Sequence, residues 1–234
     1  MSGKVLVMCA SRGRPHRLVK MVQSVERTAD NADIVVYVDD DQVADYENLP
    51  GDFKMVVGPR VGQCRSLNHI WRKCPGYEAY GAATDDCLFE TPGWDSWVLQ
   101  AKHAFKGGIG LIAPFSSSKV PRMDFPWATA EWVDVMGSFC MLDTHHSYWD
   151  VALQLVGEAT QMAFAGPEEF KVWHEALPTG DMQDASLTDV GKLMYQIYHI
   201  HNDARSVAMW AALGRHEAID KIKAAIELYA EAAV

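Results

Sequence analysis

The chain has 234 residues, of which 49% are hydrophobic and 22% charged, a composition normal for a soluble globular enzyme and unlike that of a disordered chain. Its formal net charge of −10 argues against broad, sequence-independent binding to nucleic acid or anionic membranes, which requires a basic surface. A chain of this length can bury a sizeable core, and we expect one α/β domain.

The cysteines and the apolar runs indicate the compartment. The 5 cysteines are dispersed and include no Cys-x-x-Cys pair, so we expect reduced packing residues rather than disulfides or a zinc ribbon. The apolar run at residues 5–10 is too short for a signal peptide, and no later run approaches the ~18 apolar residues of a membrane span. We therefore expect a cytoplasmic protein without a transmembrane segment.

Apolar runs alternate with helical patterns in the first half of the chain. Residues 5–9 form the first apolar run, and from His16 apolar residues recur at helical spacing. The same alternation predicts strands at 34–38, 53–57, 77–84 and 109–114, and helices at 63–73 and 92–105. This order predicts a mostly parallel, twisted sheet flanked by helices.

The pattern changes after Phe115. Residues 116–127 are polar and rich in proline, and the stretch is too long for a simple turn, so we expect an active-site loop or lid. Beyond it we expect a strand at 133–142, with Gly137 inside it, and helices at 145–156 and 216–232. We find no internal repeat and no linker.

Two adjacent carboxylates, Asp85 and Asp86, follow the apolar run that ends at Thr84. At the end of a buried strand such carboxylates repel one another and lose hydration, so a cation or several donors must compensate them. Oxygen ligands with open positions suit Mg²⁺ or Mn²⁺, which substrate phosphates complete. The pair therefore suggests a phosphate-bearing substrate. The alternative is that an aspartate caps the helix near Pro92 or closes a surface turn.

Three more polar motifs follow strands or begin helices in the first hundred residues. With Thr84-Asp85-Asp86 and residues 91–95, the set comprises Ser11-Arg12-Gly13-Arg14-Pro15, Val38-Asp39-Asp40-Asp41 and Val61-Gly62-Gln63-Cys64-Arg65-Ser66-Leu67-Asn68. In order and spacing these blocks resemble nucleotide-sugar glycosyltransferases of the GT-A type, and more narrowly the compact family-2-like enzymes of phage and bacterial genomes. The resemblance implies a GT-A (Rossmann-like) fold.

The resemblance also implies roles for individual residues. Asp86 would bind Mn²⁺ or Mg²⁺, and a late histidine, His199 or His201, would complete the metal shell. The residues implied in contacts with the nucleotide sugar are Ser11, Arg12, Arg14, Asp39, Asp40, Asp41, Arg65, Asn68 and Asp85. Arginines at such positions can donate charge-assisted hydrogen bonds to diphosphate or ribose.

Residues 180–187 resemble the segment that carries the catalytic base of the family. Because Gln183 stands where an acid usually precedes that base, both Asp184 and Asp181 are candidates. Three tryptophans could also stack on sugar or base, although large aromatic residues more often form the core: Trp94, Trp127 and Trp132.

The implied reaction moves a sugar from a nucleoside diphosphate sugar, with a UDP-sugar as the favoured donor, to an acceptor hydroxyl, with inversion by an aspartate base. Residues 1–115 would form the nucleotide-sugar-binding half and residues 116–234 the acceptor-binding and catalytic half. A nucleotidyltransferase and a non-catalytic sugar-nucleotide or glycan-binding module remain open, as does a retaining mechanism. The acceptor is also open: a glycan, a lipid, a protein, or a hydroxymethylpyrimidine DNA base whose phosphates Lys119 and Arg122 would contact.

Overall fold

The computed structural model describes residues 3–116, 123–140, 149–166, 170–174 and 215–231. The strands are β1 Val5–Ser11, β2 Ala32–Asp39, β3 Lys54–Gly58, β4 Ala79–Ala83, β5 Cys87–Phe89, β6 Leu111–Ala113, β7 Phe115–Ser116, β8 Trp127–Thr129, β9 Ala163–Ala165 and β10 Lys171–His174. The α-helices are α1 Pro15–Thr28, α2 Val43–Tyr46, α3 Gln63–Lys73, α4 Trp94–Ala104, α5 Ala130–Met136, α6 Trp149–Thr160 and α9 Arg215–Glu231, and short 3₁₀ helices are η1 Asp40–Gln42 and η2 Lys106–Gly108.

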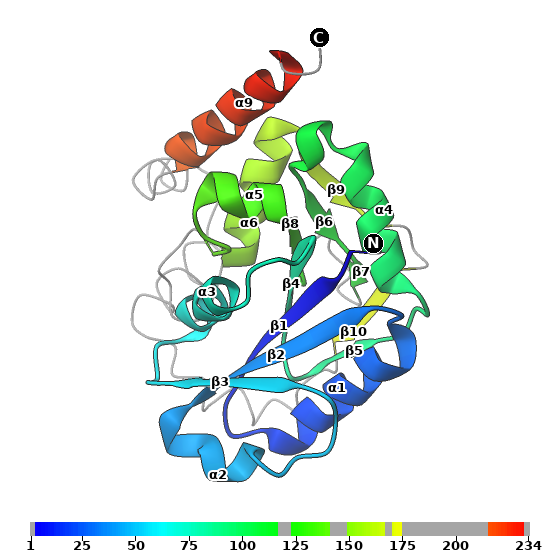
Figure 1. The fold of residues 1–234 in the computed structure, drawn as a ribbon, viewed down its shortest axis with the longest axis vertical. Helices are drawn as coiled ribbons and strands as arrows, with labels where there is room; N and C mark the ends of the chain where they lie inside the picture. The colour runs from blue at the N-terminus through cyan, green and yellow to red at the C-terminus, as the bar shows by residue number, and fades with distance from the viewer. Residues whose placement is uncertain (1–2, 117–122, 141–148, 167–169, 175–214, 232–234) are drawn as a thin grey trace, which may run out of the picture.

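Within the described residues, 7 strands form the large sheet in the order β3-β2-β1-β4-β8-β6-β9, and β5-β10-β7 form a small sheet beside it (Figure 1). In the large sheet β8 alone runs against its neighbours, pairing antiparallel with both β4 and β6. The other strands are parallel where they pair. The predicted mostly parallel α/β sheet is therefore confirmed.

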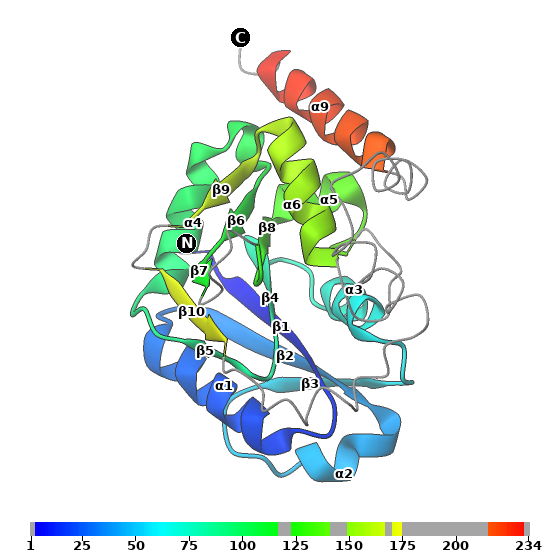
Figure 2. The ribbon, with the colours of Figure 1, turned by 180° about the vertical axis from the view of Figure 1, so that it is seen from behind.

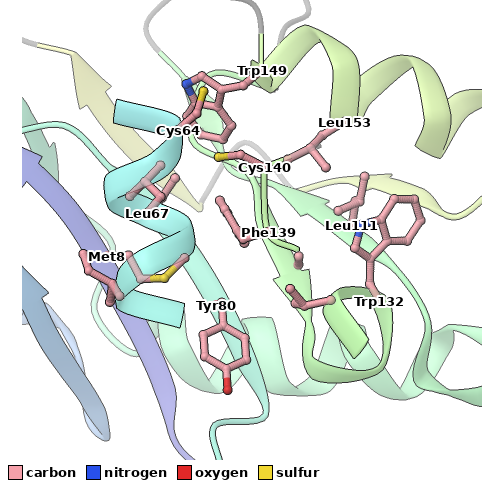
Figure 3. Packing of buried hydrophobic residues seen from close by; sticks show 14 of the residues in the cluster. Met8, Cys64, Leu67, Tyr80, Leu111, Trp132, Phe139, Cys140, Trp149 and Leu153 are labelled. Carbon is pink, nitrogen blue, oxygen red and sulfur yellow. The ribbon is translucent and has the colours of Figure 1, made fainter. Parts of the chain in front are cut away.

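Helices cover both faces of the large sheet (Figures 1 and 2). Because successive side chains of a strand point to opposite faces, β1 sends Leu6 and Met8 to the core shared with α3, α5 and α6, and it sends Val7 to the core shared with α1 and α4. Strand β1 is therefore buried on both faces, as its continuous apolar run requires. Figure 3 shows the first of these cores, where Leu67 of α3 approaches Phe139.

Three helices of the first half, α1, α3 and α4, lie where the sequence predicts helices, whereas the short helices η1 and α2 were not predicted. Helix α1 begins at Pro15, whose missing N–H is not needed in a first turn, and α3 spans the predicted residues 63–73. At the far end of the chain, α9 matches the last predicted helix and packs on α5 and α6. Among the described residues no helix has the length and apolar character needed to cross a membrane. All cysteines are free, and Cys74 alone is not fully buried, as expected of reduced packing residues.

The strand expected at residues 133–142 is wrong, because Ala130–Met136 forms helix α5. Thr129 caps this helix by accepting a hydrogen bond from Trp132 N at 3.3 Å, and Gly137 ends it with a left-handed φ of 71°. The expected loop at 116–127 is only partly a loop, since Trp127 lies in β8; residues 117–122 lie outside the described residues. The helix expected at 145–156 is found as α6, Trp149–Thr160; residues 145–148 lie outside the described residues.

Gly81 in β4 permits the close pairing of β4 with β8. It lies opposite Trp127, and a Cβ at this position would come within 2.3 Å of the Trp127 ring. Since Trp127 is fully buried, the ring has no room to move away. We expect Gly81→Ala to lower the free energy of unfolding by about 1–3 kcal/mol through overpacking, measured by urea denaturation.

A double-mutant cycle tests this cause. The cost of Gly81→Ala should fall when it is measured in a Trp127→Leu background, because the smaller side chain leaves room for the new methyl group. An equal cost in both backgrounds would assign the effect to something other than the Trp127 ring.

Candidate active site

The candidate site lies where the strand order of the large sheet changes direction. The chain runs from β1 outward to β2 and β3, then crosses back to β4 on the other side of β1. Parallel pairing sets Cys9 of β1 beside Ala83 of β4, so the loops that leave these two strands meet at the carboxyl edge of the sheet. In open α/β sheets ligands bind at such a switch point.

Asp85 and Asp86 occupy the corners of a tight turn, in which Cys87 N donates a hydrogen bond to Thr84 O at 3.1 Å. This is no surface turn, because Asp85 is 1% exposed and Asp86 5% exposed. Neither aspartate caps the following helix, since Gly93 holds the N-cap position of α4. Of the alternatives that the sequence left open, the turn is observed, but it is buried.

Arg14 spans the two carboxylates. Its Nη2 lies 2.7 Å from Asp85 Oδ1 and its Nη1 lies 3.3 Å from Asp86 Oδ2. One guanidinium thus faces two buried carboxylates, so the cluster of these three groups has a formal charge of −1 when both acids are ionised. Burial raises the pKa of the Asp85 carboxyl to about 6, although Arg14 and a hydrogen bond from Ser11 favour its charged form.

A chain of hydrogen bonds fixes the loop after β1 against these carboxylates. Arg14 N donates to the hydroxyl of Tyr46 at 3.2 Å, and Ser11 Oγ donates to Asp85 Oδ2 at 2.7 Å. The Tyr46 hydroxyl lies 2.9 Å from Ser11 Oγ and can donate to it, which completes the chain. Tyr46 is fully buried in α2 and was not predicted as a site residue.

Arg12 points to the loop after β2 rather than to Asp85. Its Nη1 lies 2.7 Å from Asp39 Oδ2 and 2.6 Å from Asp41 Oδ1, and its Nη2 donates to Asp41 Oδ2 at 2.7 Å. These bonds raise the pKa of Arg12, and they lower the pKa of Asp41. Asp40, in η1, is exposed. The diphosphate contact expected of Arg12 would therefore have to compete with two carboxylates.

Helix α3 contributes Arg65 and Asn68 in different ways. Arg65 is on the exposed side of the helix. The Asn68 amide instead binds the backbone after α5: it accepts from Phe139 N at 2.9 Å and Cys140 N at 2.8 Å, and it donates to Cys140 O at 2.9 Å. Figure 3 shows Phe139 and Cys140 beside α3. The structure thus gives Asn68 a structural role that the sequence did not predict, and a nucleotide contact would have to use the second N–H of its amide.

Of the two roles considered for three tryptophans, ligand stacking and core packing, the structure shows core packing. Trp94, Trp127 and Trp132 are fully buried, and Trp94 stacks on Phe170 with a centroid distance of 6.1 Å. Trp173 in β10 is 49% exposed, and no pattern in the sequence distinguishes it from the buried tryptophans.

Known proteins were compared with this chain in sequence and in structure. No protein-family model matches the chain, and no curated protein matches it in sequence. Solved structures do match. The mannosyltransferase PcManGT from Pyrobaculum calidifontis, in complex with GDP-Man and Mn²⁺, matches with a TM-score of 0.54 and 12% identity over 100% of this chain and 76% of that chain. The chain has the GT-A fold.

Two further GT-A structures match at similar distance. S. aureus TarS 1-349 matches with a TM-score of 0.54 and 12% identity over 73% of this chain and 60% of that chain. Glucosyl-3-phosphoglycerate synthase from Mycobacterium tuberculosis, in complex with Mg²⁺ and UDP, matches with a TM-score of 0.53 and 11% identity over 83% of this chain and 79% of that chain.

The residues at the GT-A switch point fit a hard divalent cation. Asp85 and Asp86 bring the oxygens of two carboxylates together in a buried position beside the guanidinium of Arg14. Such oxygens suit Mg²⁺ or Mn²⁺, which keep positions open for water and phosphate. Within the part of the chain that the structure describes, no group of three or more His, Cys, Asp or Glu side chains is placed to hold a metal ion.

The remaining predicted site residues of this GT-A chain lie outside the described residues. These are the base candidates and the histidine candidates, together with the two basic residues of the long loop: Asp181, Asp184, His199, His201, Lys119 and Arg122. Their roles stay predictions.

Proposed function

We propose that the chain is a glycosyltransferase that moves a sugar from a nucleoside diphosphate sugar to an acceptor hydroxyl, with the help of Mn²⁺ or Mg²⁺. The observation that carries the proposal is the pair of buried aspartates, Asp85 and Asp86, beside Arg14 at the switch point of a GT-A fold. GT-A structures that resemble the chain are described with GDP-Man and Mn²⁺ and with UDP and Mg²⁺, which supports a nucleotide-sugar donor and a divalent metal.

The roles proposed for the residues follow from their positions. Asp86, with Asp85, would hold the metal, which supplies Lewis-acid stabilisation of the charge that develops on the leaving diphosphate. Arg14 lies beside these two carboxylates and would donate hydrogen bonds to the diphosphate, because the paired N–H groups of a guanidinium match phosphate oxygens. Asp39, 7% exposed at the end of β2, has one oxygen bound to Arg12, and this pair would face the nucleoside. Residues 1–115 would bind the donor, UDP-sugar being favoured, and residues 116–234 the acceptor.

A binding screen tests the donor site directly. UDP, GDP, CMP and their sugar conjugates are added to the full chain with and without Mn²⁺, and the thermal midpoint is measured. Because ligands that bind the native state raise its apparent stability, one nucleoside diphosphate should raise the midpoint, and more so with Mn²⁺. If none of these ligands shifts the midpoint under either condition, the proposed donor site is wrong.

Asp184 is proposed as the general base of an inverting transfer. We expect Asp184→Asn to bind the donor as the wild type does but to transfer sugar about 10²- to 10⁴-fold more slowly, since the amide cannot accept the acceptor proton. Asp181→Asn is the matched control and should keep most of the activity. The reverse pattern would move the base to Asp181, and full activity of both variants would favour a retaining mechanism.

A further inference from the structure

Arg14 lies on the solvent side of the two site carboxylates. Its side chain is 31% exposed, whereas the side chains of Asp85 and Asp86 are 0% and 5% exposed. The guanidinium contacts Asp85 Oδ1 and Asp86 Oδ2 at 2.7 and 3.3 Å. Of these three side chains, that of Arg14 is the most exposed to solvent.

A divalent cation and the guanidinium compete for the same oxygens. Arg14 already lies 2.7 Å from Asp85 Oδ1 and 3.3 Å from Asp86 Oδ2, and Mg²⁺ or Mn²⁺ bound by these carboxylates would be held by the same negative charge that the guanidinium compensates. Two cations at such a short separation repel each other strongly where little water screens them. One of them must leave, or a new anion must separate them.

The loop around Arg14 allows the side chain to move alone. Its backbone N–H is held by the Tyr46 hydroxyl at 3.2 Å, and Tyr46 is fully buried. Ser11 binds Asp85 Oδ2 at 2.7 Å, an oxygen other than the one that Arg14 faces. Both anchors stay in place if the guanidinium turns away, so the exchange needs only side-chain rotation.

We propose that Arg14 is a built-in counter-cation for Asp85 and Asp86, which a divalent ion displaces when the donor diphosphate accepts the guanidinium. This inference rests on the proposed function. It predicts that the free protein binds metal weakly and that a nucleoside diphosphate strengthens metal binding, because the diphosphate removes the competitor. The two ligands are then coupled through one side chain.

The test is a titration of the full chain with Mn²⁺, followed by electron paramagnetic resonance or calorimetry, with and without UDP. In the wild type we expect UDP to tighten Mn²⁺ binding at least about tenfold. In Arg14→Gln we expect Mn²⁺ without UDP to bind at least about tenfold more tightly than in the wild type, and UDP to tighten Mn²⁺ binding by a smaller factor than it does in the wild type. Arg27→Gln removes the same charge from the exposed last turn of α1 and should behave as the wild type.

The outcomes separate this inference from the proposed function. If the wild type and Arg14→Gln bind Mn²⁺ equally well without UDP, the competition is wrong and the metal site stands. If neither binds Mn²⁺ with or without UDP, the metal-dependent function itself is wrong. If Arg14→Gln does not fold, the wild type alone can still contradict the proposal. If UDP leaves the Mn²⁺ affinity of the wild type unchanged, the proposed displacement of Arg14 is wrong.

Discussion

Asp86→Ala is expected to lower metal-dependent sugar transfer by about 10³-fold or more, with little loss of stability. Asp86 presents a carboxylate at the switch point with only 5% of its surface exposed, and its Oδ2 lies 3.3 Å from Arg14 Nη1. Without it, Asp85 alone would balance the metal charge. The stability should change little, because two effects oppose each other. The change removes the repulsion between two buried carboxylates, which is favourable, and it removes the 3.3 Å contact to Arg14, which is unfavourable.

The measurements are the initial rate as a function of Mn²⁺ and the thermal midpoint of the apoprotein. Asp52→Ala is the control, since it removes the same charge from an exposed loop before β3 and should leave both quantities unchanged. Turnover by Asp86→Ala at the wild-type rate would end the metal assignment. A drop in rate that higher Mn²⁺ restores would instead mean that Asp86 contributes affinity alone.

Asp95→Ala is expected to lower the free energy of unfolding by about 2–4 kcal/mol. Asp95 is fully buried in the first turn of α4, and its two oxygens accept hydrogen bonds from Asp30 N at 3.1 Å and Asn31 N at 2.5 Å. These N–H groups follow the end of α1, so one carboxylate ties the end of α1 to the beginning of α4. Alanine would leave both donors without this acceptor and remove a favourable charge from the first turn of a helix.

Denaturation in urea measures this loss of stability, and two further variants serve as comparisons. Asp95→Asn keeps one acceptor oxygen and should cost about half as much as Asp95→Ala. Asp220→Ala, on the exposed surface of α9, should change the free energy by less than about 0.5 kcal/mol. A midpoint for Asp95→Ala equal to that of Asp220→Ala would mean that the link between α1 and α4 contributes no stability.

The first half of the fold was predictable because its signals are strong and agree. The continuous apolar run at residues 5–9 predicts a buried strand, and Pro15 marks the beginning of the next helix. In the second half the described strands are shorter, of 2 to 4 residues each. Strand β8 has 3 residues, too few for any periodicity, and the β-branched residues Val133 and Val135 on either side of Asp134 are typical of a strand. The cap at Thr129 was the signal for a helix.

For the candidate site, the sequence could predict that the loops after β1 and β4 lie close together, but not which side chains of these loops contact each other. Strand order brings the ends of β1 and β4 together, and with them Arg14 and the aspartates. Whether Arg12 or Arg14 faces Asp85 depends on the loop conformation, which the residue types leave undetermined. Tyr46 lies 35 positions from Ser11, and nothing in an isolated helical tyrosine indicates that its hydroxyl binds the loop after β1.

The central place of β1 has a dynamic consequence. The strand has a hydrogen-bonded neighbour on each edge and a packed layer on each face, so its amides should exchange with deuterium only when the whole sheet opens. Ser11, its last residue, anchors Asp85 from this least deformable part of the molecule. Any backbone motion that admits a substrate must therefore arise outside β1, in elements with fewer neighbours, while the floor of the site stays still.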